Sequence, residues 1–520
     1  MTDNESVTKA AGTVSGAILT SRVLGFVRDI VIANLWGATL FADAFFVAFR
    51  ISNLLRRLIG EGGLTPAVVP VFTEYLHLKK REDAWRLVNL VFSIFTISLI
   101  VITLIGIIFS PLIIMVIAPG FYAWSDKFDL TVLLTRIMFP YIIFISLSAL
   151  AMGILNSLNH FLVPAISPAI WNISMISFAL LVSPYLEEPV LALAIGVVVG
   201  GIAQFLLQVP ILIKKGMRFK VIIDLNDPGV RRIWSLMLPA VFGTGITEIN
   251  LLVDNILASL LPQGSVSYLY YGNRLVQFPL GIFGVAMGIA VLPMMSGQVA
   301  RNEIEKLKDT LSFALRLVLF ITVPATIGLI VLRFPIINTL FERGEFIPST
   351  TIGVAQALFY YSLGLCAFAG LKVVVPVFYS MYDTKTPVKI GCYAMLANII
   401  LNVLLMGPLR HGGLALATSL SALMNISLLI YILRKRIGRI GGRKILLSFI
   451  KFLIVSIIMG VIMTLLIQTY FIYSDDLSRK VFILLSTVIV AVVLYILLSL
   501  IVRSEELLFL LRLVRERRRS

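Results

Sequence analysis

The chain has 520 residues, of which 59% are hydrophobic and only 14% are charged. A soluble domain holds about 45–50% apolar and about 25% charged residues. The composition therefore excludes a soluble globular protein and indicates a polytopic membrane protein. The formal net charge of +17 does not point to a nucleic-acid partner, because basic residues of a membrane protein gather in its cytoplasmic loops.

Fourteen segments of the chain have the roughly 20 apolar residues that a helix needs to cross a bilayer. We therefore predict an all-α polytopic fold of fourteen transmembrane helices. The N-terminus has no basic region before its apolar core, so no cleavable signal peptide is expected. The predicted spans are residues 10–35, 39–58, 87–118, 130–155, 161–184, 189–213, 232–260, 266–297, 311–332, 354–380, 387–407, 412–433, 446–470 and 479–502.

The loops between the predicted spans alternate sharply in basic content. One set is rich in lysine and arginine, as in residues 79–86, 214–220, 434–444 and the tail 512–519. The other set is short and neutral or acidic, as at residues 187–188. Because basic loops stay on the cytoplasmic side, this pattern places both termini in the cytoplasm.

The sequence contains a weak internal repeat. Residues 67–70 (AVVP) align with residues 290–293 (AVLP), and we call this shift along the chain the repeat offset. The same offset aligns Ser157 with Ser380, and each of these serines is followed seven residues later by a proline. The shared offset indicates a repeat of six spans.

An even number of spans gives both repeats the same orientation, so a pseudo-two-fold axis along the membrane normal should relate them. We predict an N-lobe at residues 1–220 (spans 1–6) and a C-lobe at residues 221–440 (spans 7–12). Residues 441–520 should then form spans 13 and 14 and a basic cytoplasmic tail. Transporters built in this way bind substrate between their halves and alternate the side from which it is accessible.

Several arginines lie inside the predicted spans. Arg22 and Arg28 lie in the first, Arg56 closes the second and Arg274 lies in the eighth. A charge at the bilayer centre costs about 2.5–3.5 kcal/mol or more, so such residues usually face a bundle interior or a wet cavity. The guanidinium group also pairs with phosphate through two parallel hydrogen bonds. We predict an anion-binding cavity, although pairing with carboxylates or snorkelling to the membrane surface is the alternative.

Other charged residues extend this candidate site. Asp29 lies seven residues after Arg22 on the same helical face and can partly neutralise either arginine of the first span. Asp43 lies near the outer end of the second span, and Lys372 lies in the tenth. The predicted substrate-binding residues are Arg22, Arg28, Asp29, Asp43, Arg56, Arg274 and Lys372.

A second polar group suits a cation. Asp254 lies in span 7, Asn398 and Asn402 lie in span 11, and Thr418 lies in span 12. Oxygen ligands of this kind bind hard cations, so these residues form a candidate sodium site. The alternative is that Asp254 is protonated or simply hydrogen-bonded. No other cofactor is expected.

Motifs of catalysis are missing from the sequence. It contains no P-loop, no G-x-S-x-G and no H-E-x-x-H, and its three histidines do not cluster. The two cysteines, Cys366 and Cys392, both fall in apolar segments. We therefore expect a transporter rather than an enzyme, driven by a gradient or by the membrane potential.

Five stretches of the sequence resemble one family of transporters. Residues 21–29 (SRVLGFVRD), 43–49 (DAFFVAF), 53–57 (NLLRR), 271–274 (YGNR) and 385–389 (KTPVK) resemble the MurJ (MviN) lipid II flippases. The resemblance runs through nearly the whole chain. It implies a member of the multidrug/oligosaccharidyl-lipid/polysaccharide exporter superfamily in the bacterial inner membrane.

The resemblance also implies a function and a site. Such a protein would move lipid II, the lipid-linked peptidoglycan precursor, from the inner to the outer leaflet for cell-wall synthesis. The family's arginines at the positions of Arg22, Arg28, Arg56 and Arg274 line the central cavity, and Asp43 matches a functionally sensitive position. Spans 13 and 14 would form a groove for the polyprenyl tail. Lipid II, membrane lipids and cell-wall synthesis proteins are the expected partners.

Two residues depart from the family pattern. Asn402 stands where some members have an aspartate, so the candidate sodium site has one charge fewer, and Gln277 replaces a glutamate found in some relatives. The main alternative function is a flippase for another polyprenyl-diphosphate-linked saccharide, such as an O-antigen or teichoic precursor. A membrane glycosyltransferase would need a larger external loop, and a cationic-drug exporter would need carboxylates in its cavity.

Overall fold

The computed structural model describes residues 3–471 and 476–517. Every regular element in these residues is a helix, which confirms the predicted all-α class. The chain forms two compact units, and each is described by itself. Unit 1 holds the residues up to Val266 together with Arg343–Phe346, and unit 2 holds Ser267–Glu342 and the residues from Ile347 onward.

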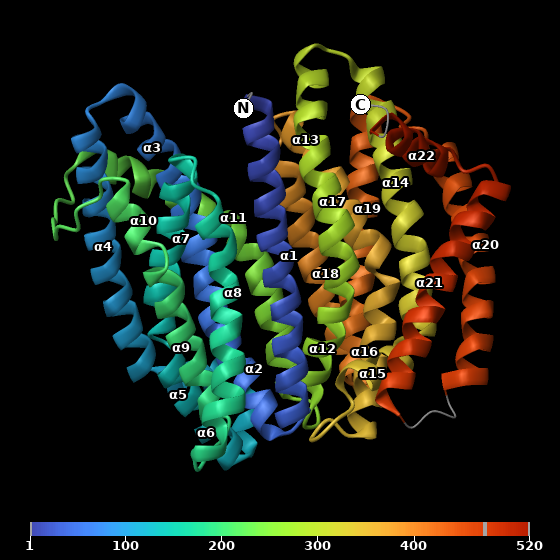
Figure 1. Cartoon of the computed structure of the whole chain (residues 1–520), viewed down its shortest axis with the longest axis horizontal. Coiled ribbons are helices and arrows are strands. Elements are labelled where there is room, and N and C mark those ends of the chain that lie inside the picture. Colours follow the sequence, from blue (N-terminus) through green and yellow to red (C-terminus); the bar gives the residue numbers. More distant parts are fainter. Residues whose placement is uncertain (1–2, 472–475, 518–520) are drawn as a thin grey trace. The chain divides into compact units, whose positions relative to one another are not determined.

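Unit 1 contains the first eleven α-helices and four short 3-10 or π-helices (Figure 1). The α-helices are α1 (Asp3–Trp36), α2 (Leu40–Leu55), α3 (Thr65–Leu78), α4 (Arg81–Ile108), α5 (Ser110–Ile117), α6 (Ser125–Met138), α7 (Tyr141–Ser157), α8 (Leu162–Ser177), α9 (Leu191–Leu206), α10 (Val209–Lys214) and α11 (Pro228–Ser259). The short helices are η1 (Arg56–Leu64), η2 (Pro119–Ala123), η3 (Phe178–Val182) and η4 (Ser183–Tyr185).

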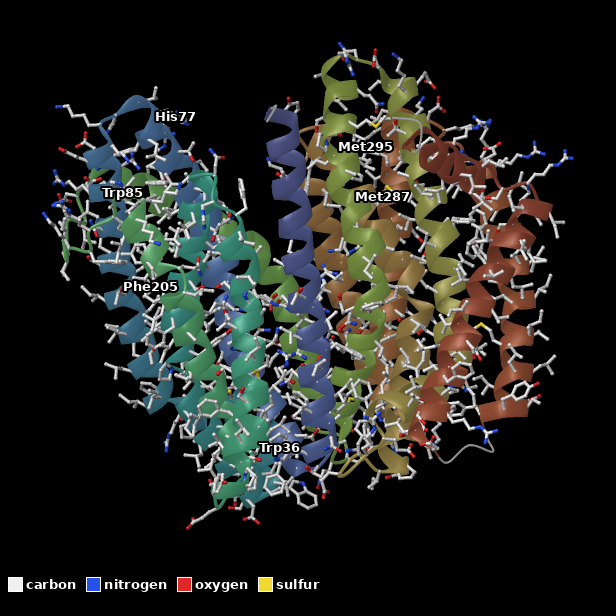
Figure 2. The ribbon with its side chains drawn as sticks, in the orientation of Figure 1. Trp36, His77, Trp85, Phe205, Met287 and Met295 are labelled. Atoms are coloured by element: carbon white, nitrogen blue, oxygen red, sulfur yellow. The ribbon has the colours of Figure 1, made fainter. Side chains whose placement is uncertain are left out.

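Aromatic and aliphatic side chains form the core of unit 1 between α3, α4 and α7. Trp85 of α4 lies against Phe72 of α3 with 5.9 Å between the ring centroids. Phe205 of α9, labelled in Figure 2, packs against Phe92 of α4 with 6.3 Å between the ring centroids. Lipid tails are as apolar as these side chains, so close packing rather than the hydrophobic effect holds such helices together.

Glycines allow the closest approaches in unit 1. A Cβ atom at Gly196, Gly200 or Gly201 of α9 would lie under 3.0 Å from a side chain of a neighbouring helix. Gly37, after α1, has a φ of +52°, and a Cβ there would lie 2.1 Å from the carbonyl oxygen of Glu345. The backbone N–H of Glu345 donates to the carbonyl of Asn34 (3.0 Å), which explains why residues 343–346 belong to unit 1.

Unit 2 contains the remaining α-helices and two π-helices. α14 packs against α17 and α20, and α18 packs against α19. The α-helices are α12 (Ser265–Pro279), which starts at the boundary, α13 (Val285–Ala300), α14 (Ile304–Val331), α15 (Arg333–Phe341), α16 (Pro348–Leu363), α17 (Leu365–Ser380), α18 (Lys385–Leu409), α19 (His411–Ile437), α20 (Gly442–Leu466), α21 (Leu477–Ile501) and α22 (Glu505–Arg517). The π-helices are η5 (Leu280–Gly284) and η6 (Ile467–Phe471).

The described residues make a multi-pass membrane protein. Nine of their helices are long and apolar enough to cross a membrane, and the bent pair α16–α17 would add a tenth. The four predicted spans outside this set are 10–35, 39–58, 232–260 and 266–297. A π-helix begins at the end of span 39–58, and another interrupts span 266–297. The count of fourteen spans therefore stays a prediction.

Helix boundaries recur at the repeat offset. The offset carries both ends of α4 onto those of α14, the C-terminal end of α1 onto that of α11, and the C-terminal end of α7 onto that of α17. The π-helix η5 also falls within the segment that corresponds to η1. This recurrence supports the internal repeat. The symmetric arrangement of two lobes and their boundaries at residues 220 and 440 stay predictions.

α11, the first helix of the second repeat, packs within unit 1 against η1 and α3. A Cβ atom at Gly63 of η1 would lie 2.6 Å from a methyl group of Val241. The boundary between the two compact units therefore lies further along the chain than the boundary between the two repeats.

Candidate substrate-binding site

Arg28 and Asp29 form a buried ion pair on α1. Arg28 is 6% exposed and Asp29 is fully buried. The Nη2 atom of Arg28 lies 2.6 Å from Oδ1 of Asp29, and Nε donates to the same oxygen at 3.1 Å. The guanidinium also lies 4.9 Å from the centroid of the Trp171 ring, close enough for a cation–π interaction. The charge of Arg28 is therefore balanced before any substrate arrives.

Asn172 of α8 also contacts the guanidinium group of Arg28. Its Oδ1 accepts a hydrogen bond from Nη1 of Arg28 (3.0 Å). Its Nδ2 donates to the carbonyls of Ser21 (3.2 Å) and Pro168 (3.1 Å). Asn172 thus ties α8 to α1 and fixes the orientation of Arg28. Our sequence reasoning missed this residue, although an asparagine inside an apolar span was a usable signal.

Arg22 differs from Asp29 in its surroundings although both lie on one face of α1. Arg22 is exposed, whereas Asp29 is fully buried. The sequence left open which arginine of the first span Asp29 would balance, and the ion pair described above joins it to Arg28. Arg22 therefore presents its guanidinium at the surface of unit 1.

Arg56 and Arg57 begin the π-helix η1. The Nε atom of half-buried Arg56 donates to Oδ1 of Asn53 (2.8 Å). Nη1 of Arg57 lies 3.3 Å from Oε1 of Glu248 on α11. π-helical turns frequently lie at functional sites, and this one brings two arginines to the segment where α2 ends.

Asp43 takes part in a second buried cluster. Its Oδ2 atom accepts hydrogen bonds from Nζ of Lys127 and from the backbone N–H of Gly264, both at 2.8 Å. Nζ of Lys127 lies 4.0 Å from the ring centroid of Phe121. These contacts join α2, α6 and the turn before α12. Lys127 lies between the predicted spans 87–118 and 130–155, and sequence reasoning did not pair it with Asp43.

The other two predicted substrate-binding residues lie in unit 2. Arg274 is half-buried on α12, and Lys372 is exposed on α17. A Cβ atom at Gly288 of α13 would lie 2.5 Å from the carbonyl oxygen of Lys372, so α13 packs closely against this turn of α17. The structure thus groups Arg28 with Asp29, and it places Asp43 in a cluster of its own.

The candidate sodium ligands are also divided between the units. Asp254 is half-buried on α11 in unit 1, whereas Asn398, Asn402 and Thr418 lie on α18 and α19 in unit 2. Nδ2 of Asn402 donates to Oδ1 of Asn398 (2.8 Å), and both residues are fully buried. The hydroxyl of Thr418 donates to the carbonyl of Leu414 (2.9 Å).

The donor types in this group suit a hard cation, since all four side chains carry oxygen atoms. Among the described residues, no group of three or more His, Cys, Asp or Glu side chains could hold a metal ion. The sodium site stays a prediction.

Comparison with known proteins assigns the chain to a family. The sequence model described as "Lipid II flippase MurJ" matches residues 32–475. The chain belongs to the MurJ family of lipid II flippases. A probable lipid II flippase MurJ of Vibrio cholerae is 42% identical over 82% of this chain and 83% of its own length. A lipid II flippase MurJ of Burkholderia cenocepacia is 38% identical over 82% and 84% of the two chains.

Solved structures agree with this assignment. A lipid II flippase MurJ in an inward closed conformation is 28% identical, with a TM-score of 0.79 over 94% of this chain and 98% of that chain. A multidrug resistance MATE family transporter of the MOP superfamily shares the fold, with a TM-score of 0.67 at 14% identity over 81% and 96% of the chains. Family membership confirms the resemblance found in the sequence and makes the protein a transporter rather than an enzyme.

Proposed function

We propose that this chain is a flippase that moves lipid II from the inner to the outer leaflet of the bacterial inner membrane. The observation that carries the proposal is the family match, which extends over residues 32–475. The arginines of α1 and η1 support it, because a diphosphate needs such donors. The alternative substrate, another polyprenyl-diphosphate-linked saccharide, offers the same charge and is an outcome of the test below.

The polar headgroup of lipid II would be prohibitively costly to bury in hydrocarbon without partners. Arg22, Arg56 and Arg274 offer guanidinium groups for its diphosphate, and Asp29 and Lys372 complete the proposed set of residues, whereas Asp43 is already paired with Lys127 and has a stabilising role. Arg28 must exchange partners to join this set, because Asp29 already holds two of its nitrogens. The bound diphosphate would compete with the Asp29 carboxylate, while Asn172 keeps the guanidinium in place.

This exchange supplies what an alternating-access cycle requires. A ligand shifts a conformational equilibrium only as far as it binds one state better than the other. In the empty protein Arg28 is balanced by Asp29, and in the loaded protein it is balanced by phosphate. Loading also adds the negative charge of the diphosphate to the site, so the empty and loaded states have different energies in the membrane potential.

The membrane potential favours the outward movement of the anionic headgroup. The inside-negative potential contributes about 2.3 kcal/mol per charge per 100 mV. At a potential of about 100 mV, moving the two charges of the diphosphate fully across the membrane would be favourable by roughly 4–5 kcal/mol, if arginine did not neutralise them. The empty, positively charged site would be drawn back towards the inward-facing state.

For this cycle we propose fourteen spans, twelve of them in two six-helix lobes and two at the C-terminus, with both termini in the cytoplasm. The recurrence of helix boundaries at the repeat offset supports the lobes, and the alternation of basic loops supports the topology. Spans 13 and 14 (α20 and α21) would hold the polyprenyl tail, since both helices carry many exposed apolar side chains. The proposal also includes a sodium ion, with Asp254, Asn398, Asn402 and Thr418 as its ligands. It further includes contact with cell-wall synthesis proteins.

Complementation in cells depleted of their own lipid II flippase tests this function. Wild type, Arg28→Ala and Arg274→Ala are compared at equal expression, with Arg86→Ala as the control because Arg86 is exposed at one end of α4. We expect rescue by wild type and by the control and failure of the other two variants. Failure of an expressed and inserted wild type would favour another lipid-linked saccharide, and rescue by Arg28→Ala would exclude the arginine site.

A further inference from the structure

A cavity of about 750 Å³ lies in unit 2, where the loop 438–441 joins α19 to α20. Apolar side chains of α14, α19 and α20 line it, among them Leu319, Ile430 and Phe449. Leu446 also lines it and is 57% exposed, so the cavity reaches the surface of the unit. Its volume lies in the range of about 300–1,000 Å³ that is typical of ligand sites.

One end of the cavity is strongly basic. Arg434, Arg439, Arg443 and Lys444 line it beside the loop. α20 starts here, and its N-cap residue, Gly441, provides no side-chain hydrogen bond. The first-turn N–H groups of a helix without a side-chain cap attract anions, as does the positive end of the helix dipole.

The arginines of this cavity differ from their basic neighbours in their partners. Arg436 pairs with Asp383, and Arg316 pairs with Glu505 and Glu506. In contrast, no described carboxylate forms an ion pair with Arg434, Arg439 or Arg443. These three guanidinium groups are therefore available to an anion.

Lys444 is the weaker member of the basic cluster. Arg316, and to a smaller extent Lys444, lowers the pKa of the Glu505 carboxyl. Lys444 thus already faces a negative charge, whereas the three arginines form no ion pair with a described carboxylate.

A buried hydroxyl lies beside the same loop. The Oγ atom of Ser312 on α14 has no hydrogen-bond partner among the described residues, and Ser312 is only 5% exposed. A Cβ atom at Gly441 would lie 3.0 Å from this oxygen. Buried polar groups of this kind usually have a partner. Ser312 adjoins Gly441, which lines the cavity, although Ser312 itself does not line it.

We propose that this cavity binds an anionic phospholipid, with the phosphate on Arg434, Arg439 and Arg443 and an acyl chain along the apolar wall. The apolar wall excludes free phosphate as the main occupant, and the cationic end selects an anionic over a zwitterionic lipid. None of the seven predicted substrate-binding residues lines the cavity. The proposed occupant is a lipid of the surrounding membrane, and because α20 also belongs to the proposed groove for the polyprenyl tail, the experiment below compares the two.

Native mass spectrometry of the purified full chain tests the charge requirement. The probes are phosphatidylglycerol, phosphatidylcholine and undecaprenyl phosphate. The test variant is Arg434→Gln/Arg439→Gln/Arg443→Gln, and the charge-matched control is Lys79→Gln/Lys80→Gln/Arg86→Gln in the basic loop of unit 1. We expect about a tenfold loss of phosphatidylglycerol binding in the test variant and little change in the control.

Three outcomes would overturn the proposal. Equal losses in both variants would mean non-specific attraction to surface charge. Equal binding of phosphatidylcholine and phosphatidylglycerol by wild type would exclude recognition of the phosphate by the arginines. Displacement of phosphatidylglycerol by an equimolar amount of undecaprenyl phosphate would make the cavity a substrate site.

A second measurement tests the cavity without changing its charge. Cys366 lines the cavity, and the only other cysteine is Cys392. In a Cys392→Ser variant, saturating phosphatidylglycerol should slow the reaction of Cys366 with a maleimide, whereas phosphatidylcholine should not. An unchanged rate while phosphatidylglycerol is bound would place the lipid elsewhere and contradict the proposal.

Discussion

The two repeats of the chain share several helix boundaries but not the buried charged residues inside the helices. At the repeat offset, Arg28 and Asp29 of the first repeat correspond to Leu251 and Leu252 of the second. Asn172, which holds Arg28, corresponds to Met395. The backbone is therefore encoded twice, and the buried ion pair is encoded once.

The same contrast holds for other polar residues. Asp43 and Lys127 correspond to Val266 and Thr350, and Asn398 corresponds to Met175. Apolar patterning and helix breaks are sufficient to repeat a helical scaffold. A site for a charged substrate needs only one set of charges, and a duplicate set would add the cost of more charge within the membrane.

The largest effect is expected from breaking the pair that only the first repeat contains. Arg28→Ala leaves the Asp29 carboxylate buried without its cation, which costs about 3–5 kcal/mol, and it removes a phosphate donor. We expect loss of flipping and a lower Tm. Leu251→Ala, at the matching position, should cost at most about 2 kcal/mol because Leu251 is only half-buried, and should keep flipping.

Stability and function can be separated at this pair. Arg28→Ala/Asp29→Ala removes both charges, so it should recover most of the Tm lost in Arg28→Ala but none of the flipping. Recovery of flipping in the double variant would show that Arg28 serves only to balance Asp29.

A second expectation concerns the Asp43–Lys127 pair, which the second repeat replaces with Val266 and Thr350. Because both residues are buried, Asp43→Asn should destabilise the protein by about 3 kcal/mol. Lipid II binding per folded molecule should be retained, as measured on protein purified to a single monodisperse peak. A loss of binding without loss of stability would instead place Asp43 on the substrate.

Sequence reasoning identified the fold class, the apolar helices and the repeat because these depend on local patterns. It selected Arg28 and Asp29 as candidate site residues because charges are rare in apolar spans. It missed Asn172 and Lys127 as partners, because the contacts join residues 144 and 84 positions apart. Such contacts depend on how helices pack, which a single sequence does not display.

Asn172 allows a smaller and more specific test. Asn172→Met copies the residue at the matching position, Met395, and removes one hydrogen bond to a charged group, which is worth about 1.5–3 kcal/mol. We expect flipping to slow by about tenfold or more while Asp29 still balances Arg28. Asn172→Gln, which keeps the amide, should retain more activity, and equal losses in the two variants would argue against a positioning role.

The smallest effects should come from pH, and they should differ between the repeats. Although burial favours its neutral form, hydrogen bonds from Thr386 and Arg436 lower the pKa of Asp383 to about 2. An unfolded aspartate titrates near a pKa of about 3.9, so the stability from this carboxylate is complete above about pH 4 and is lost as the pH falls towards 2.

His160 occupies the matching position in the first repeat. Burial, and then Lys215, lowers its pKa below 6.5. Its neutral form therefore contributes stability above about pH 6.5 that falls as the pH drops through that value. The difference in Tm between wild type and His160→Gln should change between pH 7 and pH 5. The difference in Tm between wild type and Asp383→Asn should stay constant over the same range. A change for Asp383→Asn in this range would contradict the account.

The central claim is that Arg28 exchanges its Asp29 partner for the phosphate of the substrate. The most direct measurement is the affinity of purified wild type, Arg28→Ala and Asp29→Asn for lipid II in one detergent, with Tm recorded for each. The account predicts weaker binding by Arg28→Ala and tighter binding by Asp29→Asn, because the competing carboxylate is gone. Unchanged or weaker binding by a folded Asp29→Asn protein would contradict it.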